Sequence, residues 1–238
     1  MDRPSNDEET RGDARRNTDA SITRRRALAA GGALGVAGVA GCTALDVATG
    51  DPAEFEAGTA TVADATLSES GYELNEVSDR EVSREVEVAG TTREVRVVNR
   101  VAEYDKAVEV LGERYQAAVF AALTTPRIEV LGRAVNPVGD LDDEERAELI
   151  ADRYENVDSL ERGSEYTTTV LDADADVVVY TADGEIAGTG VSTELEFHVG
   201  EAVEAGDDYV VPMAAFPASF GDGENVRRML NGIEHDPA

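Results

Sequence analysis

The sequence has very little cysteine, lysine or aromatic side chain. Cys42 is the only cysteine and Lys106 the only lysine among 238 residues, tryptophan is absent, and aromatic residues make up 5% of the chain. A single cysteine cannot form a disulfide within the chain, so a folded domain must rely on its apolar core and its hydrogen bonds. The same scarcity excludes a metal site built from several cysteines.

Positive charge is scarce as well. There are 21 Lys and Arg residues against 50 Asp and Glu residues, which gives a formal net charge of −29. This balance excludes a protein that binds the phosphate backbone of nucleic acids, and it excludes electrostatic anchoring on anionic lipids. Disorder does not follow from the charge, because 42% of the residues are hydrophobic and they recur in periodic segments.

The acidic residues are spread over nearly the whole chain and do not form a tail. Such a distribution resembles that of proteins from extremely halophilic archaea. In molar salt the Debye length is about 3 Å, so repulsion among the carboxylates is screened. We interpret the charge as adaptation of the surface to its solvent, the alternative being a polyanionic surface that captures cations.

Long hydrophobic runs are missing, but an uncharged stretch lies near the N-terminus. Residues 27–40, ALAAGGALGVAGVA, follow a polar segment that ends in SITRRR at residues 21–26. As a helix this stretch would span about 21 Å, less than the roughly 30 Å of a membrane's hydrocarbon core. The segment is therefore typical of an export signal and not of a permanent membrane span.

Two adjacent arginines, Arg24 and Arg25, stand just before this stretch. Preceded by Thr23 and followed after one residue by Ala27 and Leu28, the pair resembles the twin-arginine signal of the pathway that exports folded proteins. A weakly hydrophobic segment rich in Gly and Ala is typical of that pathway. A domain that folds before export needs no oxidative folding outside the cell, which agrees with the lack of disulfides.

The uncharged stretch ends in VAGC, formed by Val39, Ala40, Gly41 and Cys42. This motif resembles the lipobox of prokaryotic lipoproteins, in which the thiol is lipid-modified and the chain is cut before the cysteine. Small residues at positions 40 and 41 suit a peptidase that binds an extended chain, and a thiolate can form the thioether. The resemblance implies that the protein meets the membrane through a lipid on Cys42. The alternative is an incidental cysteine after an uncleaved signal.

These motifs divide the chain into three segments. Residues 1–41 form a twin-arginine signal peptide with a lipobox, residues 42–58 form a flexible tether, and residues 59–238 form one globular domain. Cleavage before Cys42 leaves 14 cationic and 44 acidic residues, a net charge of −30. The negative charge therefore belongs to the mature protein and not to the leader.

A β-hairpin is predicted for residues 81–101. A register that places Val82 opposite Val101 makes one face of the hairpin apolar and the other charged, with residues 90–92 in the loop. Half-buried antiparallel strands show this alternation.

The next segment, residues 107–123, fits two structures. Apolar residues at helical spacing favour a helix that passes into a strand, whereas the apolar run at residues 117–123 also fits a buried strand that ends at Pro126. The residues at helical spacing are Val108, Leu111, Tyr115, Ala118, Val119 and Ala122.

The rest of the chain alternates between helix and strand signals. Asp142 and Glu145 form a capping-box pair at the start of one helix, and the spacing of apolar residues at 226–233 predicts an amphipathic helix near the C-terminus. A turn at Asp183-Gly184 and a proline, Pro212, that places the last strand at an edge or bulge complete the pattern. Strands are predicted at residues 166–171, 177–182, 194–199 and 209–216. The fold class is therefore α+β, a mainly antiparallel β-sheet with packed helices in a single domain.

No motif for catalysis, for a metal or for a cofactor is complete. His198 and His235 belong to no zinc motif, and we expect His198 on the surface or hydrogen-bonded in the sheet and His235 in a frayed terminus. Asp222 is expected at the N-cap of the last helix. An aspartate-rich stretch lacks the glycine and glutamate of a calcium loop and fits a solvated strand end. Its members are Asp172, Asp174, Asp176 and Asp183.

Three longer sequence segments that follow the lipobox resemble a wider family of proteins. They are VAEYDK at residues 101–106, TTPRIEVLGRAVNP at residues 124–137 and GDDYVVPMAAFP at residues 206–217. Together they resemble a haloarchaeal family of lipoproteins of unknown function. That family has no assigned active site, so the resemblance implies lipid anchoring and a single domain but transfers no catalytic residue.

We therefore expect a lipoprotein on the outer face of the cytoplasmic membrane. The lack of a catalytic motif favours a non-enzymatic binding or envelope accessory module without a cofactor, and the sequence does not identify its protein or small-molecule partner. The alternatives are an exported hydrolase and a domain that captures solutes or metals. A deep pocket with converging polar groups would favour these alternatives.

Overall fold

The computed structural model describes residues 53–238 apart from residues 89–90, 111, 131–132 and 135–140. This part of the chain is an α+β domain in which a mostly antiparallel sheet of nine strands carries three helices, so the predicted fold class is confirmed. The sheet strands are β1 (Ala53–Glu56), β3 (Glu73–Val88), β4 (Thr91–Val110), β5 (Glu113–Pro126), β8 (Glu161–Val170), β9 (Ala173–Ile186), β10 (Val191–Gly200), β11 (Val203–Ala205) and β12 (Asp208–Pro217). The helices are α2 (Asp64–Ser70), α3 (Asp143–Ala151) and α4 (Gly223–Asn231), with a 3-10 turn, η1 (Ala218–Phe220), before α4. Two further pairs are β2 (Thr59–Val62) with β13 (Ile233–Asp236), and β6 (Glu129–Val130) with β7 (Arg133–Ala134).

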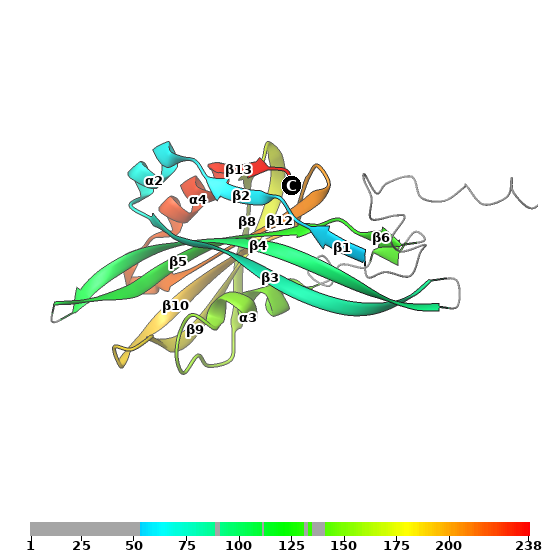
Figure 1. Cartoon of the computed structure of the whole chain (residues 1–238). Helices are drawn as coiled ribbons and strands as arrows, with labels where there is room; N and C mark the ends of the chain where they lie inside the picture. Colours follow the sequence, from blue (N-terminus) through cyan, green and yellow to red (C-terminus); the bar gives the residue numbers. More distant parts are fainter. Residues whose placement is uncertain (1–52, 89–90, 111, 131–132, 135–140) are drawn as a thin grey trace, which may run out of the picture. The chain divides into compact units, whose positions relative to one another are not determined.

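The strands follow the order β1-β4-β5-β12-β10-β9-β8, with β3 paired to β4 and β11 paired to β12 (Figure 1). All of these neighbours are antiparallel except β1, which runs parallel to β4. β3, β4 and β5 follow one another as hairpins, and so do β8, β9 and β10. β12 lies between β5 and β10 and joins the two series into one sheet.

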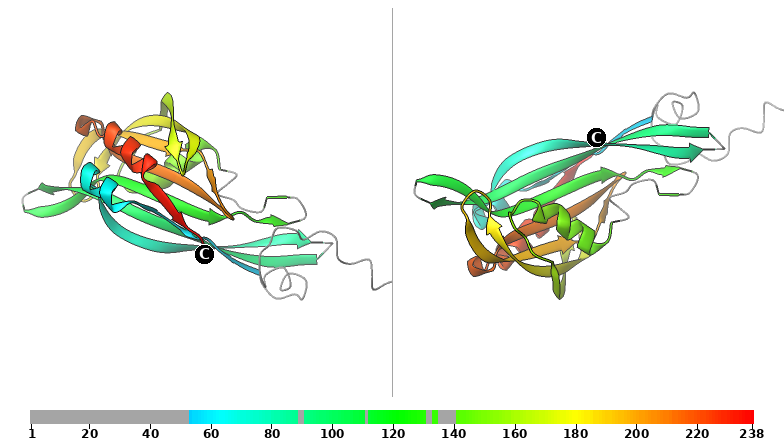
Figure 2. Two further views of the ribbon diagram at one scale, coloured as in Figure 1. Left: turned by 90° about the horizontal axis from the view of Figure 1, so that it is seen from above. Right: turned by 90° about the horizontal axis from the view of Figure 1, so that it is seen from below.

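Both faces of this sheet are covered, and the pleat assigns alternate residues to each face. One side, which we call the α4 face, carries α2, α4 and the β2–β13 pair, and its core includes Phe120 and Phe216. The opposite α3 face carries α3, and its core includes Phe197 and Ile150. Figures 1 and 2 show α3 on one side of the sheet and the other two helices on the other side.

β3 and β4 form the predicted hairpin, but the predicted register is wrong. Val82 lies opposite Val97 and not opposite Val101, because residues 91–92 continue the strand instead of forming a loop. The predicted loop residue Gly90 lies outside the described residues. The register differs by an even number of residues, so each residue keeps the face that the sequence assigns to it.

The helix favoured for residues 107–123 is wrong. β4 continues to Val110 and β5 runs from Glu113 to Pro126, which confirms the alternative of a buried strand that ends at Pro126. Every residue of β5 from Ala117 onward is buried. Since this strand is packed on both of its faces, its apolar residues do not alternate with polar ones, and its pattern also fits a helix.

α3 begins as its capping signal predicts. Asp142 Oδ1 accepts a hydrogen bond of 2.9 Å from the backbone N–H of Glu145, and Glu145 Oε2 accepts one of 3.0 Å from the backbone N–H of Asp142. This complete capping box fixes the first turn of the helix. The four predicted strands after α3 coincide with parts of β8, β9, β10 and β12, except that β8 ends at Val170, one residue before the predicted end.

Two turn signals in these strands are misleading. Asp183 and Gly184 lie inside β9 and pair with β10, and the chain turns at residues 187–190 instead. Pro212 lies in the central strand β12 and not at an edge. A proline fits there because the neighbour of β12 changes from β11, before Pro212, to β10, after it, so a break in the ladder already exists.

Both ends of the described chain belong to the fold. Residues 53–56 fall within the predicted tether, yet they form β1 and pair with β4. The predicted C-terminal helix is present as α4, and the expected frayed terminus after it is wrong, because β13 pairs with β2. Among the described residues no helix is long and apolar enough to cross a membrane.

Candidate functional site

The predicted targeting residues lie outside the part of the chain that the structure describes. Residues 1–52, which fall outside it, include all six: Arg24, Arg25, Val39, Ala40, Gly41 and Cys42. Export and lipidation therefore stay predictions. Within the described domain, a surface hollow and several buried clusters of polar side chains are candidate sites.

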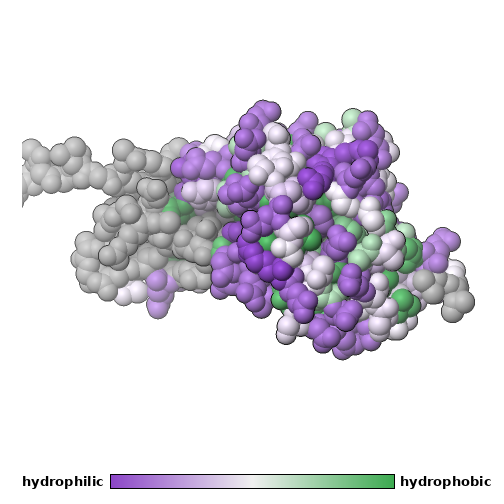
Figure 3. All heavy atoms as spheres, turned by 180° about the vertical axis from the view of Figure 1, so that it is seen from behind, coloured by the Kyte–Doolittle hydropathy of each residue, from purple (hydrophilic) through white to green (hydrophobic). Residues whose placement is uncertain are grey.

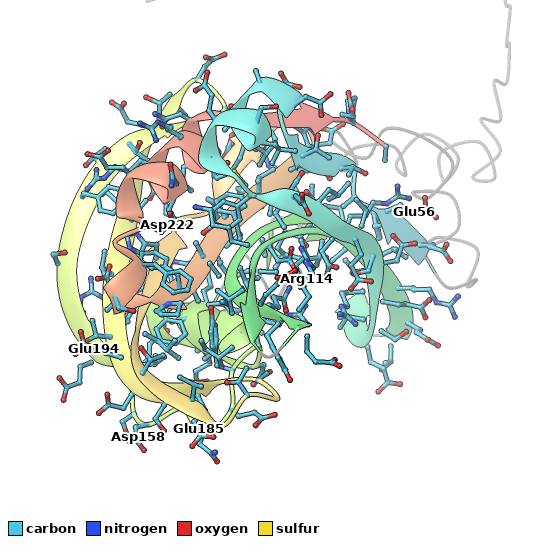
Figure 4. All side chains as sticks on the ribbon, turned by 90° about the vertical axis from the view of Figure 1, so that its left-hand side faces the viewer. Glu56, Arg114, Asp158, Glu185, Glu194 and Asp222 are labelled. Carbon is cyan, nitrogen blue, oxygen red and sulfur yellow. The ribbon has the colours of Figure 1, made fainter. Side chains whose placement is uncertain are left out.

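The hollow has a volume of about 530 Å³ and lies between α3 and the chain that follows it. It is lined by Glu144, Glu148, Ala151, Asp152, Tyr154, Val157, Asp158, Ser159 and Leu160. The carboxylates in this lining are exposed, and Figure 4 shows Asp158 at the periphery of the domain. The Tyr154 hydroxyl is already used, because it lies 3.0 Å from the carbonyl oxygen of Ala117 and 2.8 Å from that of Ala215. The hollow is thus lined by exposed carboxylates together with the apolar residues Ala151, Val157 and Leu160.

Two carboxylates are buried on the α3 face and are neutralised by arginines. Glu103 and Asp105 of β4 are 3% and 4% exposed. Asp105 accepts hydrogen bonds of 2.9 and 3.3 Å from the two terminal nitrogens of Arg114, and Glu103 forms an ion pair with Arg153. Two side-chain amides each donate a hydrogen bond of 3.1 Å to the other oxygen of Glu103. Three of the four carboxylate oxygens accept hydrogen bonds, and the fourth, Glu103 Oε2, faces the guanidinium of Arg153.

On the α4 face, His198 forms a hydrogen-bonded cluster. Its Nδ1 lies 2.9 Å from the Tyr166 hydroxyl and its Nε2 lies 3.4 Å from Glu196, while Arg227 of α4 stacks on the Tyr166 ring at 3.5 Å from the centroid. Burial lowers the pKa of His198, and it raises the pKa of Tyr166 to about 12. His198 is therefore a neutral, buried residue at pH 7 that is hydrogen-bonded in the sheet, which is the second of the two expected positions, and it does not lie on the surface.

A second cluster on the α4 face contains the only lysine. Lys106 Nζ lies 2.7 and 2.9 Å from the two carboxylate oxygens of Asp222 and 4.8 Å from the centroid of the Tyr72 ring. Asn225 donates a hydrogen bond of 2.7 Å to the same carboxylate. The side chain of Asp222 is 7% exposed and that of Lys106 is 25% exposed. An amine and a carboxylate are thus held in direct contact in a largely dry environment.

Asp222 occupies the N-cap position of α4, as the sequence predicts, but it does not cap the helix. Its side chain accepts no hydrogen bond from the first turn of the backbone, because it is turned toward Lys106. Figure 4 shows Asp222 at the start of α4, whereas Glu185 and Glu194 lie at the periphery. The cluster therefore connects β4 of the sheet to the helix that covers it.

A further cluster fastens the C-terminal strand. Asp208 Oδ2 accepts a hydrogen bond of 2.9 Å from the backbone N–H of Gly58 and lies 2.9 Å from His235 Nε2. A Cβ atom at Gly58 would lie 2.3 Å from the carbonyl oxygen of Asp236, so only glycine fits there. This arrangement holds β13 and the start of β2 against β12, which is a structural role.

The aspartates singled out as a weak metal candidate do not converge. Asp172 lies in the tight turn between β8 and β9 with a positive φ, and Asp176 accepts a hydrogen bond of 2.7 Å from Thr167. Asp183 lies farther along β9, where its side chain is exposed. Nowhere in the described ranges do three or more His, Cys, Asp or Glu side chains form a group that could hold a metal ion.

The extent of the domain agrees with a comparison against known families. Residues 59–234 match the family described as Domain of unknown function (DUF6517). The chain belongs to this family. Comparison with curated proteins and with solved structures found no match. The family match begins at β2 and ends within β13, so it covers almost all of the described DUF6517 domain except β1.

Most of the surface of the DUF6517 domain that Figure 3 shows is hydrophilic, with apolar residues in small separate areas. The clusters described above contain buried residues such as Glu103, His198 and Asp222, and sequence reasoning missed their contacts. The partners Lys106 and Asp222 are separated by 116 positions, so no local pattern connects them. The signal that could have drawn attention to this site is the presence of one lysine in a chain whose other cations are all arginine.

Proposed function

We propose that this protein is a lipid-anchored, non-catalytic binding or accessory module of the cell envelope, exported through the twin-arginine pathway and held by Cys42 on the outer face of the cytoplasmic membrane. The single observation that carries the proposal is the order of the N-terminal motifs: Arg24 and Arg25, an uncharged stretch, and then VAGC with the only cysteine of the chain.

Features of the folded domain support a module that folds before export. The domain contains no disulfide among its described residues, because the only cysteine lies upstream at position 42. Its buried charges are already paired within the described chain, so it needs no metal or partner to compensate them. A domain of this kind can fold fully in the cytoplasm, as the twin-arginine pathway requires.

The geometry also supports a binding role over hydrolysis. Glu103 and Asp105 are buried and engaged with arginines, and His198 is hydrogen-bonded inside the sheet. A general acid or base must reach a substrate atom, whereas these groups reach only their neighbours in the described structure. The hollow beside α3 is lined by exposed carboxylates and lacks a convergent set of buried polar groups.

Cell fractionation tests the anchor. The full chain, expressed in a host that processes lipoproteins, should sediment with membranes and be released by detergent. The variant Cys42→Ser should leave the membrane fraction, because the thioether cannot form, while the matched variant Thr43→Ser should stay in it. Equal membrane association of Cys42→Ser and the unchanged protein would contradict the proposal.

A second pair of variants tests the export route. Replacing both Arg24 and Arg25 with lysine keeps the positive charge of the leader but removes the twin-arginine pair. We expect the folded precursor to accumulate in the cytoplasm with its leader intact. Replacing Arg15 and Arg16 with lysine, in the polar segment upstream, provides the matched control and should not change export. Normal export of the Arg24 and Arg25 variant would contradict this route.

A further inference from the structure

The lysine cluster holds a nucleophile and an electrophile in contact. Lys106 Nζ lies within 2.9 Å of both oxygens of the Asp222 carboxylate. Such a position lies about 3 Å from the carbon that the two oxygens share, which is within the distance range of a near-attack geometry. From this geometry we propose that Lys106 and Asp222 form an intramolecular isopeptide bond, a covalent amide that joins β4 to the start of α4.

The reaction balances with the two side chains alone. The Lys106 ammonium transfers a proton to the Asp222 carboxylate, and after rotation of the carboxyl group Nζ attacks Cγ. A hydroxyl group then leaves Cγ and takes a second proton from the nitrogen, so one water molecule is released. One N–C bond forms, one C–O bond breaks, and nothing is oxidised or reduced. An ammonium and a carboxylate thus become a neutral amide, which removes two charges from the interior.

Neighbouring groups are placed to assist this step. Asn225 Nδ2 donates to Oδ1 of Asp222 at 2.7 Å, where it stabilises the negative charge that develops when Nζ adds to Cγ. The Tyr72 hydroxyl is buried and lies near the Asp222 carboxylate. Burial and the nearby Asp222 carboxylate raise the pKa of Tyr72, so its hydroxyl stays protonated and can donate a hydrogen bond to the oxygen that leaves.

The surroundings also favour the product over its hydrolysis. Tyr72 is 2% exposed and belongs to the core of the α4 face, and its ring covers Lys106 Nζ. Few water molecules can reach an amide in this position. The contact depends on tertiary structure, since it joins residues 116 positions apart, so the bond forms only after the domain has folded.

Lysine is the residue type that this chemistry requires. A guanidinium stays protonated in proteins and is a poor nucleophile, so the arginine pairs of the α3 face cannot react in this way. Lys106 is the only side-chain amine in the chain. A bond across 116 positions restricts the unfolded chain as a long-range disulfide would, and a chain with a single cysteine cannot form such a disulfide.

The single lysine allows a direct test on the full-length protein. The purified chain is denatured and digested with a protease that cleaves after lysine, and its intact mass is measured. We expect a chain that resists cleavage and that is lighter by the mass of one water molecule than its sequence requires. Complete cleavage at Lys106 together with the full sequence mass would overturn the proposal.

Four variants identify the two residues that the bond joins. Asp222→Ala should be cleaved after Lys106 and show its full mass. Lys106→Arg should also show its full mass, while Asp222→Asn should lose ammonia instead of water and reach the mass of the linked wild-type chain. The matched control Glu224→Gln, an exposed residue in the first turn of α4, should stay linked. A loss of water that persists in Asp222→Ala would place the bond elsewhere and overturn the assignment, and the wild-type mass remains decisive where a variant fails to fold.

The variant Tyr72→Phe tests the assisting role of the hydroxyl. It keeps the aromatic ring over Lys106 and removes only the hydroxyl group that donates the hydrogen bond. We expect the linked mass to appear more slowly in newly synthesised, pulse-labelled chains of this variant than in those of the unchanged protein, while the final folded spectrum is the same. An unchanged rate would exclude Tyr72 as the donor.

Discussion

The two faces of the sheet bury charge in different ways. On the α3 face, Glu103 and Asp105 meet the guanidinium groups of Arg153 and Arg114. On the α4 face, one lysine meets one aspartate beneath an aromatic ring. The residues responsible alternate along a single strand, because Glu103 and Asp105 of β4 point to one side and Lys106 points to the other.

This difference shows that the type of cationic residue at each site depends on how deeply the site is buried. Arg114 is 54% exposed, so its broad guanidinium spans from the buried Asp105 to the solvent. Lys106 is 25% exposed and lies close to the Tyr72 ring, where a compact ammonium fits between a ring and a carboxylate. Arginine thus serves a network at the rim of the domain, and lysine serves a closed contact between sheet and helix.

The largest expected effects test whether both faces are equally packed. Phe197 of the α3 face and Phe216 of the α4 face are both fully buried. Replacing either with alanine should lower the free energy of unfolding by about 3–5 kcal/mol, because each leaves a cavity. Denaturant unfolding at constant salt measures both values. A much smaller loss for one of the two would show that the core on that face is loosely packed.

Removing one charged contact on each face should change the free energy of unfolding by clearly different amounts. Lys106→Met removes the proposed amide and leaves Asp222 buried without a cation, so it should lower the free energy of unfolding by at least about 3 kcal/mol. Arg114→Met should cost less, because solvent can reach the site that the exposed guanidinium covers. The comparison uses the same unfolding experiment and the same replacement residue. Equal losses in the two variants would contradict the distinction between a closed contact and a rim network.

The helix that covers each face begins differently, and one substitution at each N-cap tests this. Asp142 caps α3 with a hydrogen bond, so Asp142→Ala should lower the free energy of unfolding by about 1 kcal/mol. Asp142→Asn should recover most of the loss, because an amide oxygen can also accept the bond. At α4, Asp222 makes no capping bond, so Asp222→Ala should remove the contact with Lys106 without weakening the helix start. Helix content measured by circular dichroism, together with stability, distinguishes these outcomes.

The smallest expected change in the free energy of unfolding at neutral pH is that of a substitution at His198. Burial lowers the pKa of His198 in the folded protein below its ordinary value of 6.5, so the unfolded chain binds its proton more readily. The contribution of His198 to the free energy of unfolding is therefore fully present above pH 6.5 and decreases as the pH falls below that value. In His198→Gln this loss should disappear from the pH profile of unfolding, although Glu196, Arg227 and Tyr166 still face the site. An unchanged profile would show that His198 does not titrate on unfolding.

Local signals in the sequence predicted local structure well. The capping box of Asp142 and Glu145 is present, and the strands after α3 lie where alternation places them. The fold class could be predicted for the same reason, since it depends on the type and order of the elements. The failures lie where tertiary packing decides. β5 is buried on both faces and loses the alternation that marks a strand, and Pro212 is tolerated in a central strand because its neighbour changes there.

The candidate sites could be predicted only in part. The lipobox and the arginine pair are contiguous motifs, which a sequence displays directly. The contacts of Lys106 with Asp222, and of His235 with Asp208, join distant positions and depend on the order of strands in the sheet. A sequence read alone therefore locates the anchor more readily than the buried clusters of the domain.

The anchor is the central claim, and the mass of the N-terminal peptide of the native protein tests it most directly. The protein is extracted from membranes, digested and analysed by mass spectrometry. The account predicts a peptide that begins at Cys42 and carries a lipid on its sulfur, with no trace of residues 1–41. An intact leader with an unmodified thiol at Cys42 would contradict it.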